Sequence, residues 1–156
     1  MSRTFTRTFI VLGALLVLGS VNYSIYAKER IKNHGEVIYL RLAPVDPRSL
    51  MQGDYMALRF SIVNDFARLG SADQRIPLHV DERRVATVGG PESTLRLRYR
   101  VRDGQVWIGT NAYFFEEGSA DRYSGAHFGK FRIDPQTGEA VLVGLCDEQL
   151  RDLGGG

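Results

Sequence analysis

Two short stretches contain residues that could bind or act on another molecule. The first runs from "PVDPRSL" into "MQGDYMALRF", and the second is "GTNAYFFEEG". Carboxylates, a guanidinium group and a phenol can exchange hydrogen bonds with a polar ligand or with a protein partner. The candidate ligand- or partner-binding residues are Asp46, Arg48, Gly53, Asp54, Tyr55, Glu116 and Glu117.

The segment around Gly53 predicts a rigid corner in the chain. Pro44 and Pro47 fix their own backbones and bias the residues before them away from the α region. Gly53 permits a tight turn, and Asp54 can accept hydrogen bonds from the amides of that turn. Two interpretations stay open, a structural corner that sets strand register and an exposed loop that presents its charged side chains to a partner or substrate.

The sequence contains no motif typical of an enzyme. A nucleophile needs a base within reach, and Glu116 and Glu117 would point to opposite faces of a strand. No two of the three histidines stand three or four positions apart, as zinc-binding pairs often do. These observations favour a non-enzymatic protein without metal or cofactor. The alternative is a composite site of His127, Asp121 and one of the two glutamates.

An alternating run of arginines lies in "TLRLRYRVRDGQVW". The side chains of Arg96, Arg98, Arg100 and Arg102 would lie on one face of a strand, and Asp103-Gly104 predicts a hairpin turn after it. This arginine ladder is interpreted as the solvated face of a sheet, screened by acids on neighbouring strands. An alternative is the binding of an anion or of anionic lipid headgroups.

The N-terminal part of the chain predicts a membrane anchor. No charged residue occurs from Thr8 to Ala27, a length that suits one bilayer crossing. Tyr23 and Tyr26 stand where aromatic residues favour the headgroup level. A cleaved signal peptide is the alternative, but cleavage after Ala27 would place Ile25 where a small residue is required.

The short basic tail before this segment is typical of an N-terminus that stays in the cytoplasm. We therefore expect a single-pass protein of the cytoplasmic membrane whose C-terminal domain is extracytoplasmic. The expected organisation is a cytoplasmic tail (1–8), a transmembrane anchor (9–27), a tether (28–35), an extracytoplasmic β-rich domain (36–153) and a flexible tail (154–156).

Period-two alternation and turn residues predict the fold of the domain. "DYMALRFSI" places Met56, Leu58, Phe60 and Ile62 on one face. "HFGKFRID" and "EAVLVGL", joined by "PQTG", suggest a second hairpin. We expect a mainly β fold, a small antiparallel β-barrel or sandwich, with short helical pieces at 63–69 and 147–153.

Charge and cysteine content limit the partners. The 20 basic and 18 acidic residues give a net charge of +2, and no basic run is interleaved with aromatic residues, so we expect no nucleic-acid partner. Cys146 is interpreted as a small hydrophobic residue after a strand.

Gly53, Asp54, Tyr55, Leu58 and Phe60 resemble the signature of the GDYXXLXY family of bacterial membrane-anchored proteins. Phe60 replaces the second tyrosine of that motif, which keeps the ring and removes the hydroxyl. The segments "PVDPRSL", "GTNAYFFEEG" and "LVGL" are also similar to the family pattern, so the resemblance spans about residues 42–145. It implies a multi-spanning membrane protein as the class of partner.

We therefore expect a membrane-anchored, extracytoplasmic accessory protein that acts with an integral membrane protein. The alternative is a hydrolase or small-ligand-binding enzyme with its site at the proline-rich GDY loop.

Overall fold

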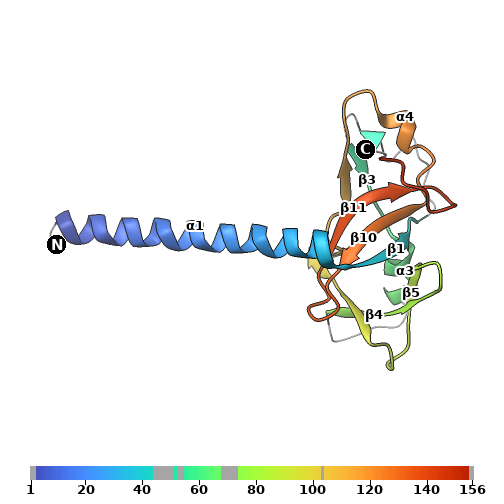
Figure 1. The fold of residues 1–156 in the computed structure, drawn as a ribbon, viewed down its shortest axis with the longest axis horizontal. Helices are drawn as coiled ribbons and strands as arrows, with labels where there is room; N and C mark the ends of the chain where they lie inside the picture. Colours follow the sequence, from blue (N-terminus) through green and yellow to red (C-terminus); the bar gives the residue numbers. More distant parts are fainter. Residues whose placement is uncertain (1–2, 44–50, 53–54, 68–73, 103, 155–156) are drawn as a thin grey trace.

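The computed structural model describes residues 3–43, 51–52, 55–67, 74–102 and 104–154, and a long helix leads into a β-rich domain (Figure 1). The helices are α1 (Arg3–His34), α3 (Ser61–Ala67) and α4 (Ala120–Tyr123). The strands are β1 (Glu36–Arg41), β2 (Met51–Gln52), β3 (Tyr55–Ala57), β4 (Arg75–Val80), β5 (Ala86–Val88), β6 (Leu95–Arg98), β7 (Arg100–Arg102), β8 (Gln105–Trp107), β9 (Ala112–Phe114), β10 (Phe128–Ile133) and β11 (Ala140–Cys146). The expected mainly β fold behind one N-terminal helix is confirmed.

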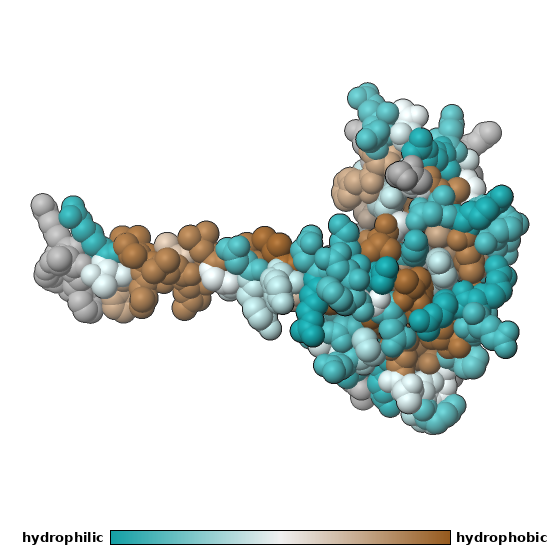
Figure 2. Space-filling view, viewed as in Figure 1, coloured by the Kyte–Doolittle hydropathy of each residue, from teal (hydrophilic) through white to brown (hydrophobic). Residues whose placement is uncertain are grey.

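α1 is one helix of 32 residues. It lacks proline, so nothing in it interrupts the intrahelical hydrogen bonds, and it ends where the Gly35 amide donates to the Ile31 carbonyl at 2.8 Å. The helix continues through residues 28–34, the segment expected to be a tether. Large apolar side chains between Phe9 and Tyr26 are 50% to 74% exposed, and Figure 2 shows them as a brown band along the helix. α1 is long and apolar enough to cross a membrane.

The last turns of α1 are fixed to the β domain. Ile31 is 6% exposed because this part of the helix contacts β10 and β11. Lys28 Nζ lies 2.8 Å from Glu139 Oε2, and Arg132 Nη1 donates to the Gly35 carbonyl at 3.0 Å. These contacts hold the domain at the end of the apolar segment. The long dimension of the domain lies roughly perpendicular to the axis of α1 (Figure 1).

The described strands form small antiparallel sheets. Their orders are β1–β10–β11, β2–β3–β9, β5–β4–β6 and the hairpin β7–β8. In none of these sheets does the last strand pair with the first, so the described strands form no closed barrel. Of the two predicted forms, barrel and sandwich, the barrel is therefore not observed. Strand twist and the short length of most of these strands allow them to pack around one core without closure.

The predicted inward face of the Met56–Ile62 segment is confirmed. Met56, Leu58, Phe60 and Ile62 are 2% to 3% exposed and belong to the main hydrophobic core. Regular strand geometry ends at Ala57, however, and α3 already begins at Ser61, so the inward positions are shared by a strand, a loop and a helix.

Both predicted hairpins are present. β7 and β8 pair in register from Arg100↔Trp107 to Arg102↔Gln105, and Gly104 has a φ of 74°. In the turn between β10 and β11, Asp134 accepts a hydrogen bond from the Gln136 amide at 2.8 Å. That bond is the first cause of the lowered pKa of the Asp134 carboxyl.

The predicted terminal helix at 147–153 is wrong. The Asp147 carboxylate accepts hydrogen bonds from the amides of Gln149 and Arg151, both at 2.9 Å, and Leu150 has a φ of 63°. The side chain thus takes the Arg151 amide, which in a helix would donate to the Asp147 carbonyl, and the positive φ of Leu150 lies outside the α region. The segment forms a turn and returns to β11 through the bridge Cys146↔Asp152.

Candidate functional site

Tyr55, the described residue of the GDY triplet, forms an aromatic pair with Phe114. The chain reverses direction between Gln52 on β2 and Tyr55 on β3, which are paired residues. Tyr55 also pairs with Phe114 on β9, and their ring centroids lie 5.7 Å apart. Tyr55 is half-buried, whereas Phe114 is 74% exposed. The predicted site residues Asp46, Arg48, Gly53 and Asp54 lie outside the described residues.

Glu116 and Glu117 follow β9 and are both exposed. They lie beside Phe114 in sequence, before α4. The neighbouring Phe115 turns inward instead, where its ring stacks on that of Tyr123 at 5.2 Å. We name the surface made by Tyr55, Phe114, Glu116 and Glu117 the Tyr55–Phe114 face. It combines an exposed aromatic ring with two carboxylates.

The second half of the motif is inside the protein. Leu58 is 2% exposed and Phe60 is 3% exposed, and the Phe60 ring meets that of Phe131 edge-on at 5.2 Å. A Cβ atom on Gly129 would lie 2.9 Å from Phe60 Cε1, so glycine is required for this close approach. Leu58 and Phe60 are therefore core residues, whereas the corner residues that precede Tyr55 lie outside the described residues.

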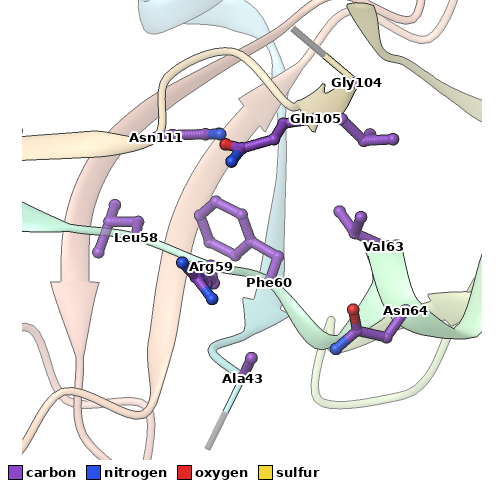
Figure 3. A pocket seen from close by; sticks show the side chains of 10 residues that line it. Ala43, Leu58, Arg59, Phe60, Val63, Asn64, Gly104, Gln105 and Asn111 are labelled. Atoms are coloured by element: carbon purple, nitrogen blue, oxygen red, sulfur yellow. The ribbon is translucent and has the colours of Figure 1, made fainter. Parts of the chain in front are cut away.

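A cavity of about 510 Å³ adjoins this part of the motif (Figure 3). Leu58, Phe60 and Val63 form apolar parts of its wall, and the side chains of Asn111 and Gln105 point toward one another beside the Phe60 ring. Arg59 supplies a cation. No carboxylate, cysteine or histidine lines the described part of the wall, which is suited to hydrogen bonding with a polar group.

His127 pairs with Glu148, which is not a member of the composite site considered for it. Its Nδ1 atom lies 3.2 Å from Glu148 Oε2, and Arg41 donates to the same carboxylate at 3.1 and 3.4 Å. The hydrogen bond from Arg41 is the first cause of the lowered pKa of Glu148. The partner of His127 in the described chain is thus Glu148 at the end of the domain.

Cys146 and Lys130 both carry potentially reactive side chains. Cys146 is fully buried, and desolvation raises the pKa of its thiol to about 11, which leaves it protonated at neutral pH. Lys130 Nζ lies 3.2 Å from Asp152 Oδ2 in an ion pair. Among the described residues, no three or more His, Cys, Asp or Glu side chains are placed to hold a metal ion.

The arginine ladder is divided between two sheets. β6 pairs with β4, β7 pairs with β8, and the intervening Tyr99 is buried against Phe66. Even so, Arg98 and Arg100 both reach Glu139, at 3.5 and 3.9 Å. Glu139 also accepts the hydrogen bond from Lys28, so one carboxylate screens three cations. Sequence reasoning missed this cluster because Lys28 and Glu139 are 111 positions apart.

We expect the contribution of Glu139 to stability to disappear in acid. The hydrogen bond from Lys28 is the first cause of the lowered pKa of its carboxyl. A carboxyl with a lowered folded pKa stabilises the folded state fully above its ordinary pKa of 4.5, and this stabilisation is lost as the pH falls through the lowered value. Thermal unfolding of wild type and Glu139→Gln should therefore differ at about pH 7 and converge as the pH falls through the lowered pKa of Glu139. Exposed Glu116→Gln is the control, and a Glu139→Gln difference that is constant with pH would contradict the expectation.

Comparison with known proteins gives one match. A family model with the description GDYXXLXY protein matches residues 17–145. The matched region begins inside the apolar part of α1 and extends to Leu145 in β11, so it covers most of the chain. No curated protein and no solved structure matches the chain.

Proposed function

The chain belongs to the GDYXXLXY family, and we propose that it is a membrane-anchored accessory protein whose extracytoplasmic β domain binds a multi-spanning membrane protein. α1 is the anchor, in a bacterial cytoplasmic membrane, and the basic tail that precedes it stays on the cytoplasmic side. Because long domains translocate largely regardless of their charge, the β domain lies on the opposite side.

The observation that carries the proposal is the exposure of Phe114. Outside α1, the large hydrophobic side chains that the described structure leaves exposed are Val101 at 57% and Phe114 at 74%. Aromatic residues are enriched in the centres of protein interfaces. Phe114 has Tyr55 as a neighbouring ring and two carboxylates next to it in sequence, which together provide an apolar anchor with a polar rim.

The attachment of the domain to α1 favours a partner in the same membrane. Ile31 and the Lys28–Glu139 ion pair join helix and domain without a flexible connection. The β domain is therefore held beside the bilayer, where a membrane protein is present at a high effective concentration.

A photo-crosslinking amino acid in place of Phe114 tests the interaction in intact cells. We expect a crosslink from position 114 to an integral membrane protein and none from position 101, the matched exposed site on β7. In detergent extracts the same protein should be recovered with wild type and with Val101→Ala, but not with the double variant Tyr55→Ala, Phe114→Ala. The proposal fails if both positions crosslink alike, or if the double variant recovers the same proteins as wild type.

The cavity beside Phe60 supports a second candidate, binding of a small polar ligand near the GDY loop. Its described wall offers three side-chain amides, those of Asn64, Gln105 and Asn111, and a guanidinium group, which recognise carboxylate or amide groups. This candidate differs from the first because its ligand would raise the melting temperature of the purified protein without any membrane partner.

A further inference from the structure

A basic groove lies where α1 meets the β domain. It has a volume of about 310 Å³, and its walls include Ser24 and Lys28 from α1, Arg98, Arg100 and Arg102 from β6 and β7, and Glu139 from the turn before β11. We call it the basic groove. The Tyr55–Phe114 face contributes no residue to it.

The described walls of the groove carry more positive than negative charge. Lys28 and three arginines supply four positive charges, and Glu139 is the single acid among the described lining residues. That carboxylate is already shared, because Lys28 lies 2.8 Å from it and Arg98 lies 3.5 Å from it. One carboxylate cannot neutralise four cations, so the groove has a strong preference for a further anion.

The groove lies at the level of lipid headgroups when α1 crosses a bilayer. The apolar segment 9–27 has 19 residues, which at about 1.5 Å each span about 28 Å, close to the hydrocarbon thickness of about 30 Å. Lys28 is the first charged residue after this segment, and Ser24 lies about one helical turn nearer the lipid. One wall of the groove is therefore continuous with the lipid-facing helix.

The aromatic side of the groove fits the same location. Trp107 lines the groove, and the Arg102 guanidinium lies 5.7 Å from the centre of its ring. Tryptophan favours the membrane interface, where the apolar ring and the indole N–H both find suitable surroundings. The ring also holds the guanidinium in place without cancelling its charge.

From these observations we propose that the basic groove binds the phosphate of an anionic phospholipid headgroup. Arg100 and Arg102 are both exposed and can each offer two parallel N–H donors to phosphate oxygens. Glu139 keeps Lys28 and Arg98 together at the base of the groove and limits their mutual repulsion. The inference rests on the anchoring of α1 in the proposed function, but it does not depend on the protein partner.

Native mass spectrometry of the full-length protein in detergent micelles tests the groove. The probes are phosphatidylglycerol and the zwitterionic phosphatidylcholine. We expect wild type to bind phosphatidylglycerol more tightly, and Arg100→Gln, Arg102→Gln to bind it about 30-fold more weakly, since each basic residue near an anionic surface contributes about a fivefold factor. The matched control is Arg83→Gln, Arg122→Gln, which removes the same charge outside the groove and should bind like wild type. Added salt should weaken the binding.

Equal binding of the two lipids, or equal losses in the two double variants, would overturn the proposal. Displacement of the lipid by inorganic phosphate at matching concentration would also overturn it, because the site would then recognise free phosphate. Co-flotation of wild type with phosphatidylcholine vesicles tests the anchor separately, and a protein that does not float would remove the premise. Melting curves of both double variants establish that a weaker signal comes from a folded domain.

Discussion

Replacement of Phe60 by alanine is expected to lower the free energy of unfolding by about 3–5 kcal/mol, the usual range for a buried phenylalanine. Phe60 is 3% exposed, and its ring contacts Phe131 edge-on at 5.2 Å. The approach of Gly129 to the same ring leaves no side chain at that position able to fill the space. The loss therefore combines removed apolar contacts with a cavity beside β10.

Phe114→Ala is the matched control for this prediction. The substitution is chemically identical, but Phe114 is 74% exposed, so we expect a change within about 0.5 kcal/mol. Urea unfolding of the full-length protein in detergent, followed by the fluorescence of its single tryptophan, Trp107, measures both variants. Comparable losses in the two variants would contradict the assignment of Phe60 to the core.

The described residues of the family motif have two different surroundings: some are buried in the core, and one contacts the exposed Phe114. Leu58 and Phe60 are core residues, and a change there acts on binding of the membrane partner only through the fold. Tyr55 pairs with an exposed ring on β9 and can act on a partner directly. A variant of Phe60 that loses the partner is therefore informative only when its folding is measured as well.

The fold class was predictable because it depends on local signals. Alternation identified the inward face of Met56, Leu58 and Phe60, and two-residue turn chemistry identified the β7–β8 hairpin. β4 was not predicted, and its Pro77 lacks an N–H donor, a feature that argues against a central strand. In the structure Pro77 still contributes its carbonyl, which accepts a hydrogen bond from Gly89 at 2.8 Å.

The sites were less predictable because they depend on long-range proximity. The arginine ladder was visible in the sequence, but the acid that screens it is on a turn about forty positions later, and Lys28, which shares that acid, is on α1. Tyr99 also turns inward and separates the ladder into two sheets, and Arg96 does not line the groove. No local pattern encodes the convergence of Lys28, Arg98 and Arg100 on Glu139.

The largest effect on location is expected from charges placed in the middle of α1. Leu15 and Leu18 lie near the centre of the apolar segment and are 62% and 59% exposed. Each aspartate at the centre of a membrane helix costs about 2.5–3.5 kcal/mol, so Leu15→Asp, Leu18→Asp should cost about 5–7 kcal/mol of insertion. We expect the double variant to leave the membrane fraction, and a reporter after Gly156 to lose its extracytoplasmic signal.

Val101→Asp, Phe114→Asp adds the same charge to exposed apolar positions of the β domain and should leave the protein in the membrane. The comparison separates an anchor from a helix that lies in water, because aspartate at an exposed position of a soluble helix costs only a fraction of a kcal/mol. Leu15 and Leu18 precede the part of α1 that meets the domain at Ile31, so the β domain should unfold at the same temperature in the double variant. A change in membrane location without a change in domain stability can come only from the loss of contact between α1 and lipid. Retention of the double variant in the membrane, with its reporter still extracytoplasmic, would contradict the anchoring role of α1.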